Sequence, residues 1–267
     1  MNLFINEKAV KVDEELTLGE LAARHYPGAD LLIMNGFPVP PDTLVQDGDE
    51  LFLIRRGVQP AAEELEFLMA ARHTPGVHAR LKKAVVAIAG VGGLGSAVAV
   101  ALARIGVGHL VIADFDLVEP SNLNRQQYFV DQIGQYKVEA LAANLLRINP
   151  YVAVEPHCLM LSPDNIPQIF AKCPIIVEAF DRADMKAMLV DTVLCQMEEA
   201  KIVAASGIAG FDSNNSIVTR KVSSRLYLVG DGVSEAKPGN GLMAPRVAIA
   251  AGHQANQVVR LLLGEEL

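Results

Sequence analysis

The chain has few cysteines, no long apolar run and no excess of basic charge. Only Cys158, Cys173 and Cys195 are present, and their odd number and wide spacing argue against a disulfide framework and against paired Cys-x-x-Cys zinc ligands. We therefore expect no structural zinc, and we interpret the three thiols as ordinary buried side chains.

The other two absences exclude further classes of protein. Gly, Pro or charged residues interrupt the longest apolar stretches within the length of one strand or helix, and the N-terminus has no signal-type pattern. We expect a cytoplasmic protein without a membrane segment. The net charge of −8 and the lack of a basic stripe disfavour nucleic-acid binding, so a protein or small molecule is the expected partner.

The chain does contain enough apolar material for two folded modules. Hydrophobic residues make up 51% of the 267, which suffices for one sizeable α/β domain and a small one. Residues 1–57 are the more acidic part. We divide the chain into a small domain (1–57), a linker (58–62) and a larger domain (63–267).

The small domain has the element order of a β-grasp fold, in which a sheet wraps around one helix. Thr17 is the predicted N-cap of that helix, with Glu20 at the capping-box position. Turn residues, such as the Asp47-Gly48-Asp49 segment, separate the predicted strands. These strands span residues 3–5, 9–12, 31–34 and 50–54.

The larger domain alternates strands and helices, which is typical of a doubly wound, mostly parallel sheet. The predicted strands cover 85–89, 110–113, 152–155, 175–178 and 201–205, and the helices between them cover 94–105, 138–148 and 184–197. After these come two shorter strands, expected to be antiparallel, at 216–222 and 226–229, then a Gly-rich loop at 230–241 and a helix at 245–263. A helix at 63–72 precedes the sheet, and we expect its apolar face to pack on the larger domain.

Glycines follow the first strand of the larger domain with dinucleotide-binding spacing. The run from Gly90 through Gly92, Gly93 and Gly95 to Ser96 predicts a tight strand-to-helix turn, whose backbone N–H groups approach a polyphosphate. Nineteen residues after the last of these glycines, Asp114 ends a strand at the position where this fold holds ribose hydroxyls. A plain turn aspartate is the alternative interpretation.

Two permanent cations and a further carboxylate lie downstream. Arg125 belongs to a loop, and Lys137 opens a helix. Such a pair suits charge that builds on a phosphate in transfer, although both residues would also suit a solvated surface. Asp181 follows a buried strand at the ligand-binding edge of the sheet, where it either orients Mg²⁺ or caps the helix from Asp184.

Five elements in this order resemble the ThiF/MoeB/ubiquitin-activating family of adenylyltransferases: GxGGLGS, DFD, SNLNRQ, a helix-opening Lys and a post-strand Asp. The resemblance implies a Rossmann-like homodimer that uses ATP and Mg²⁺ to adenylate the C-terminal glycine of a carrier protein. It implies Arg125, Lys137 and Asp181 as catalytic residues, with Asp181 as the Mg²⁺ ligand. The implied ATP site comprises Gly90, Gly92, Gly93, Gly95, Ser96, Asp114, Asp116, Asn122, Arg125, Gln126 and Lys137.

Residues 1–57 resemble ThiS, the thiamine sulfur carrier, through Met34-Asn35-Gly36 and the segment from Gln46 to Leu51. The two halves together resemble ThiF with a fused ThiS-like domain, which implies a role in thiamine thiazole biosynthesis. A substrate carrier needs a free Gly-Gly carboxylate, whereas Gly57 continues into Val58 here. We therefore hypothesise that residues 1–57 dock or regulate, and that a separate ThiS-like carrier with a free Gly-Gly end is the substrate.

Other functions stay open on the sequence alone. The same fold activates other carriers or an RNA-borne carboxylate. The glycine motif with Asp114 would also fit an NAD-linked oxidoreductase, which leaves Arg125 and Lys137 without a role. The non-enzymatic alternative is a carrier-binding module without catalysis, because a sequence does not establish that the five elements converge in space.

Overall fold

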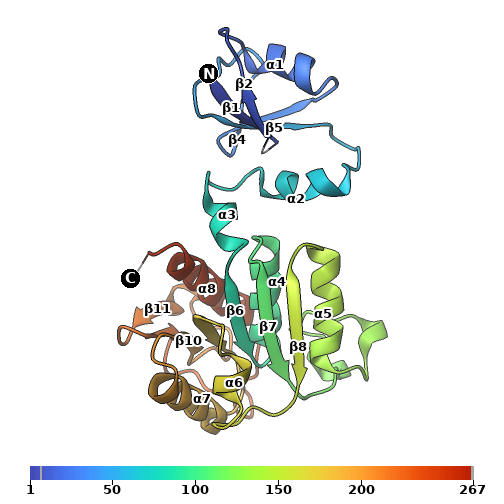
Figure 1. The fold of residues 1–267 in the computed structure, drawn as a ribbon. Coiled ribbons are helices and arrows are strands. Elements are labelled where there is room, and N and C mark those ends of the chain that lie inside the picture. Colours follow the sequence, from blue (N-terminus) through green and yellow to red (C-terminus); the bar gives the residue numbers. More distant parts are fainter. Residues whose placement is uncertain (7, 266–267) are drawn as a thin grey trace. The chain divides into compact units, whose positions relative to one another are not determined.

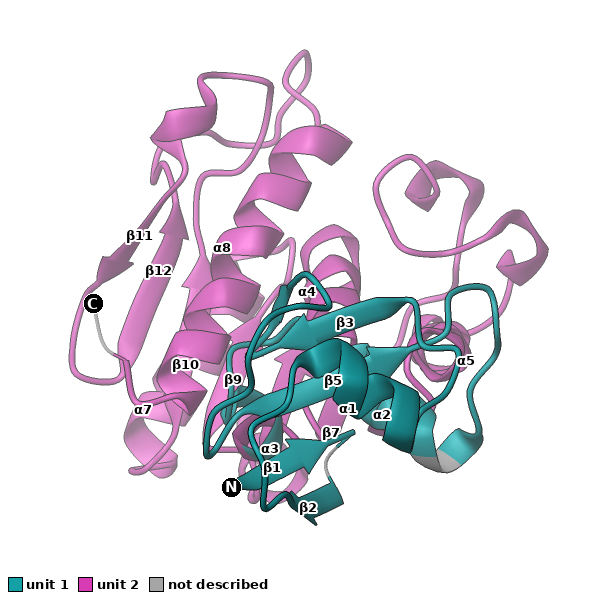
Figure 2. Ribbon diagram, turned by 90° about the horizontal axis from the view of Figure 1, so that it is seen from above, with its two compact units in different colours: residues 1–79 teal, residues 80–267 magenta. Residues whose placement is uncertain are grey.

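The computed structural model describes residues 1–6 and 8–265, so the last two residues of the larger predicted domain lie outside the description. The chain forms two compact units, Met1–Ala79 and Arg80–Leu267, which Figure 2 shows in different colours. Within the described ranges, every helix is too short or too polar to cross a membrane.

The first unit contains a five-stranded sheet and confirms the predicted β-grasp fold. The sheet order is β2-β1-β5-β3-β4, with β1 and β5 parallel and the other pairs antiparallel. Its elements are β1 (Asn2–Ile5), β2 (Lys8–Lys11), α1 (Leu18–His25), β3 (Leu31–Met34), β4 (Phe37–Pro38) and β5 (Glu50–Ile54). Thr17 caps α1, and Glu20 completes the predicted capping box by accepting a bond from the backbone N–H of Thr17.

Both faces of this small sheet are apolar, and each is covered by a helix. Leu51 and Leu53 of β5 lie in the core that contains the buried side of α1, whereas Phe52 points the other way. Phe67 of α2 (Ala62–Ala70) packs against the cluster that contains Phe52. The expectation that this helix packs on the larger domain is therefore wrong, because its apolar side chains cover the second face of the small sheet.

The second unit contains a seven-stranded sheet and confirms the doubly wound prediction (Figure 1). The order is β11-β12-β10-β9-β6-β7-β8, and only the β11–β12 pair is antiparallel. The strands are β6 (Val85–Ala89), β7 (His109–Asp114), β8 (Ala153–Cys158), β9 (Ile175–Glu178), β10 (Lys201–Ala205), β11 (Val218–Lys221) and β12 (Leu226–Gly230). The helices are α3 (Val77–Leu81), which begins in the first unit, and α4 (Gly93–Arg104), α5 (Lys137–Ile148), α6 (Ile166–Ile169), α7 (Ala183–Gln196) and α8 (Ala244–Leu262).

Helices cover the large sheet on both sides because its central strands are apolar on both faces. Val86 and Ile88 of β6 pack in one core with α4, α5 and α8, while Ala87 and Ala89 pack in a second core with α6 and α7. Strand β6 has β7 on one side and β9 on the other, so the chain changes direction at this strand. In open α/β sheets, such a switch point at the carboxyl ends of the strands is where ligands bind.

The three cysteines do not share one environment. Cys173 is buried, and this burial raises the pKa of its thiol to about 12. Cys158, at the end of β8, and Cys195, in α7, are exposed. The interpretation of all three as buried thiols is therefore confirmed for Cys173 and wrong for Cys158 and Cys195. Cys158 lies on the edge strand β8, and Cys195 lies in the last turn of α7.

Candidate active site

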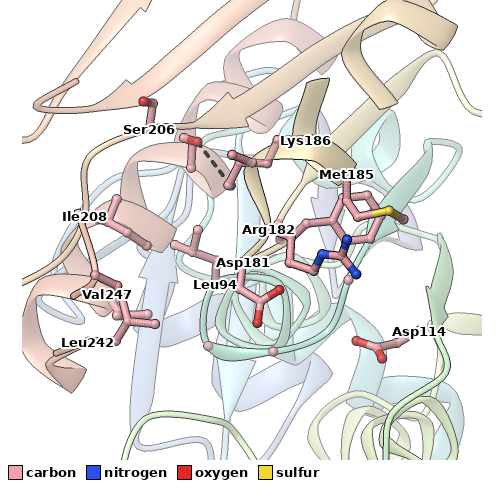
Figure 3. A pocket seen from close by; sticks show the side chains of 18 of the residues that line it. Leu94, Asp114, Asp181, Arg182, Met185, Lys186, Ser206, Ile208, Leu242 and Val247 are labelled. Atoms are coloured by element: carbon pink, nitrogen blue, oxygen red, sulfur yellow. Dashed lines mark hydrogen bonds between the residues drawn. The ribbon is translucent and has the colours of Figure 1, made fainter. Parts of the chain in front are cut away.

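A cavity of about 640 Å³ lies at the carboxyl ends of the large sheet (Figure 3). It is bounded by the segments that follow β6, β7, β9, β10 and β12. In the view of Figure 3, Asp181 and Arg182 lie near the middle, Asp114 lies at one side, and the apolar Ile208 and Leu242 lie at the other. The cavity therefore combines a polar region with a region suited to an uncharged group.

At Gly90 and Gly95, the glycine turn after β6 is packed too closely to admit a side chain. Gly90 has φ +84°, and a Cβ atom there would lie 2.9 Å from the carbonyl oxygen of Ala179. A Cβ atom at Gly95 would lie 1.9 Å from the carbonyl oxygen of Gly90. The helix α4 begins at Gly93, and its N-cap, Gly92, supplies no side-chain cap. Its first N–H groups can therefore bind an anion.

Asp114 fixes the position of this turn. Its carboxylate accepts bonds from the backbone N–H of Val91 at 2.8 Å and from that of Asp116 at 2.9 Å. Tyr128 donates its hydroxyl to the carbonyl oxygen of Val91 at 2.6 Å, and burial raises the pKa of this tyrosine above its ordinary value. The ends of β6 and β7 are thus tied together beside the cavity.

Lys137 lies almost fully buried at the start of α5 and also lines the cavity. Its ammonium group is 2.7 Å from a carboxylate oxygen of Asp116, which is half exposed. The cation is therefore held beside the glycine turn by one carboxylate that water can also reach.

Arg125 and Gln126 bring further polar groups to the same wall. The guanidinium of Arg125 donates to the carbonyl oxygen of Ser121 at 3.0 Å and to the side-chain oxygen of Asn124 at 2.8 Å. Its Nε atom and the Oε1 atom of Gln126 are buried and have no hydrogen-bond partner within the described part of the chain. Both residues line the cavity, where a ligand can supply the missing contacts.

Three residues of the predicted ATP site lie outside the cavity lining and serve the local fold. Gly95 allows α4 to approach the turn, as described above. Ser96 donates its hydroxyl to the carbonyl oxygen of Gly92 and accepts the backbone N–H of Gln127. Asn122 caps a short 3₁₀ turn by accepting the N–H of Glu119 at 3.1 Å.

Asp181 is exposed in the cavity on the segment after β9, between the polar and apolar parts of the view in Figure 3. The helix α7 begins at Ala183 with Arg182 as its N-cap, so Asp181 does not cap it. The position of this segment is fixed by Glu178, which is fully buried and accepts bonds from Lys186 at 2.9 and 3.0 Å. Burial raises the pKa of Glu178, and the nearby ammonium group of Lys186 opposes this shift.

The sequence missed several groups at this edge. Glu178 ends strand β9 and Lys186 lies in the helix that follows, so no single periodic pattern relates them, and Arg182 is a single charge after a strand. Gly232 to Ala236 also form part of the wall. In the sequence, only the cluster of glycines between residues 230 and 241 indicates that wall.

The sheet, the glycine turn and the cavity define a Rossmann-like α/β domain with a charged site at its switch point. A model of the ThiF family matches residues 68–267, and a model described as ThiS-like ubiquitin matches residues 1–57. The chain therefore belongs to the ThiF family, with an N-terminal ThiS-like domain. The resemblance found in the sequence is confirmed.

The chain is similar to several proteins of known name. The molybdopterin-synthase adenylyltransferase of Escherichia coli K12 is 30% identical over 190 residues, which cover 69% of this chain and 75% of that protein. The SAMP-activating enzyme E1 of Haloferax volcanii is 37% identical over 125 residues, or 46% of each chain. The E. coli tRNA N6-threonylcarbamoyladenosine dehydratase, solved with ATP, shares the fold at a TM-score of 0.68 and 22% identity, covering 78% of this chain and 97% of that one.

Proposed function

We propose that this chain uses ATP and Mg²⁺ to adenylate the C-terminal glycine of a separate ThiS-like sulfur carrier, in thiamine thiazole biosynthesis. The observation that carries the proposal is that Arg125, Lys137 and Asp181 line one cavity with the glycine turn. The relationship to the E. coli adenylyltransferase supports the reaction type.

The polar part of the cavity fits a nucleoside triphosphate. Gly90, Gly92 and Gly93 line the cavity, and the N–H groups at the N-terminus of α4, which no side chain caps, would bind phosphate oxygens. The carboxylate of Asp114 lies where ribose hydroxyls would donate to it. Lys137, Arg125 and Gln126 would contact the phosphates or the reacting carboxylate.

The chemistry needs positioned charge rather than a protein nucleophile. An oxygen of the carrier carboxylate attacks the α-phosphorus, the bond from that phosphorus to the bridging oxygen breaks, and pyrophosphate leaves with the bonding electrons. The product is an acyl-adenylate. Lys137 and Arg125 stabilise the negative charge that grows on the phosphate oxygens, and the cavity walls hold the two reactants in line.

Asp181 is the residue proposed to hold Mg²⁺. Residues 1–6 and 8–265 contain no group of three or more His, Cys, Asp or Glu side chains able to hold a metal by themselves. A single exposed carboxylate beside a site for a triphosphate still fits this ion, because Mg²⁺ keeps several waters and shares phosphate oxygens. When bound, the ion neutralises charge on the leaving pyrophosphate.

The fused ThiS-like domain is proposed to dock or regulate rather than to serve as the substrate. Gly57 has φ +76° within a turn, and its carbonyl carbon is bonded to Val58 rather than free as a carboxylate. The following helix, α2, covers the second face of the β-grasp sheet. Mass spectrometry of the protein incubated with ATP tests this point: cleavage after Gly57 with AMP on that fragment would contradict it.

ATP–pyrophosphate exchange tests the main proposal. We expect exchange that requires ATP, Mg²⁺ and a purified ThiS carrier ending in Gly-Gly, and we expect none with the same carrier lacking its last glycine. Arg104→Ala is a matched control, because Arg104 is an exposed cation at the end of α4 outside the cavity. Full exchange without any added carrier, or none with every carrier offered, would refute the proposal.

The 30% identity to molybdopterin-synthase adenylyltransferase favours a second candidate substrate, the carrier subunit of molybdopterin synthase. The same exchange assay compares the two carriers directly. A higher kcat/KM with the molybdopterin carrier would replace the thiamine assignment while leaving the reaction unchanged.

We also propose that the protein is a homodimer in the cytoplasm. Sedimentation equilibrium tests the dimer, because it measures whether the mass in solution is that of one chain or of two.

A further inference from the structure

The apolar end of the cavity has a wall with little packing of its own. Residues 232–236 form this wall, and Val233 within it is 85% exposed. Hydrophobic packing therefore does not fix its position. Polar contacts hold it instead: those of the Asp231 carboxylate, the bond from the N–H of Gly232 to the carbonyl oxygen of Ser206 at 3.1 Å, and the bond from the side-chain amide of Asn240 to the carbonyl oxygen of Glu235 at 2.9 Å.

Asp231 organises the start of the wall. One of its oxygens accepts the backbone N–H groups of Val233 and Ser234, each at 2.8 Å. Its own N–H donates to the carbonyl oxygen of Gly207 at 3.0 Å, on the segment that forms the facing part of the cavity. The two segments lie so close that a Cβ atom at Gly207 would be 2.0 Å from the Asp231 carboxylate.

Arg246 holds the other oxygen of Asp231. Its guanidinium is 2.7 Å from that oxygen and also donates to the carbonyl oxygens of Asp212 and Ser213, at 3.0 and 3.2 Å. A fourth bond, of 3.1 Å, goes to the hydroxyl of Ser216. Arg246 is 3% exposed, so this set of contacts is shielded from water.

The position of Arg246 on its helix is unfavourable in isolation. It lies in the first turn of α8, where the helix dipole repels a cation. The next residue, Val247, belongs to the cavity lining together with Leu242 and Ile208. Arg246 thus connects α8, which contributes Val247 to the apolar end of the cavity, with the loop at 212–216 and, through Asp231, with the wall at 232–236.

We propose that Arg246 is a positioning residue for the carrier: through Asp231 it holds residues 232–236 as the wall against which the carrier's terminal residues lie. This inference rests on the proposed function. In that function ATP would occupy the other end of the cavity, so Arg246 should control use of the carrier and leave use of ATP largely unchanged.

The test compares Arg246→Ala and Asp231→Asn with Arg225→Ala. Arg225 is a matched control, since it also donates to three carbonyl oxygens, but these belong to Leu194, Met197 and Ala200, none of which lines the cavity. With the ThiS carrier in the exchange assay, we expect Arg246→Ala and Asp231→Asn to raise the carrier KM at least about tenfold and to change the ATP KM by less than about twofold. Arg246→Lys, which keeps the charge, should recover part of the loss.

Amide hydrogen exchange without ATP or carrier gives a second measurement. The N–H groups of Val233 and Ser234 should exchange faster in Arg246→Ala and at the wild-type rate in Arg225→Ala. An unchanged carrier KM, or unchanged protection at these two amides, would overturn the inference. If wild-type protein fails to use any carrier, the proposed function fails, and the amide measurement still decides whether Arg246 holds the wall.

Discussion

The two sheets of this protein bury different kinds of side chain. Both are covered by helices on both faces, but the described part of the small unit buries one polar side chain, Asn6, which bonds to the backbone of Leu53. The large unit buries Lys137, Glu178 and Arg246 around its cavity. Burying charge is costly unless it is paired, and each of these groups has a partner of opposite charge in the chain: Asp116, Lys186 and Asp231, respectively. The large unit thus places buried ion pairs around its cavity, whereas the interior of the small unit is almost wholly apolar.

The largest effect should come from removing apolar volume in the small sheet. Phe52→Ala deletes a nearly buried ring beneath α2 and should destabilise the first unit by about 3 to 5 kcal/mol. Urea denaturation followed by far-UV circular dichroism measures this change. The exposed Phe37→Ala is the control, and an equal effect of both substitutions would contradict the two-faced packing of the sheet.

Removing charge from the large unit should impair turnover instead. Arg125→Ala, Lys137→Ala and Asp181→Ala should each slow pyrophosphate exchange by on the order of a hundredfold or more, the scale of losing one transition-state contact. Steady-state kinetics measures the exchange rate of each variant and compares it with that of the Arg104→Ala control. Near-normal rates in all three variants would show that the cavity charges do not act on the reaction.

Acid should weaken the ion pair that holds the cavity wall. Burial alone would raise the pKa of Asp231, but the N–H groups of Ser234 and Val233 and the Arg246 cation lower it to about 2, from 3.8. A lowered pKa contributes stability that is present above pH 4 and lost as pH falls toward 2. This contribution corresponds to about 2 kcal/mol at neutral pH, and urea titrations should show wild type losing it relative to Asp231→Asn between about pH 4 and 2.

The smallest effect should be local to the small unit. Thr17→Ala removes the N-cap of α1 and should cost about 1 kcal/mol of its stability, whereas Thr17→Ser should cost little because serine can make the same bond. Thermal unfolding of both variants measures the difference. Equal losses in the two would mean that the methyl group of Thr17, rather than its hydroxyl, stabilises the helix end.

Local patterns in the sequence predicted most of the fold. The capping residues Thr17 and Glu20 act over four positions, and the alternating strands and helices follow from apolar periodicity. Apolar periodicity does not predict which charged residues form ion pairs across different elements. The pairs Asp231–Arg246 and Glu178–Lys186 were missed because they depend on the path of the loops after each strand. The exposure of Cys158 was missed for a related reason, since residue type alone does not reveal which strand forms the edge of a sheet.

The contact between Lys137 and Asp116 has a consequence for the first step of ligand binding. The lysine has already lost most of its hydration shell during folding, so an arriving polyanion does not have to remove that water. It would displace a carboxylate that is half exposed and can return to solvent. Association would then be an exchange of one anion for another at a cation that folding has already desolvated.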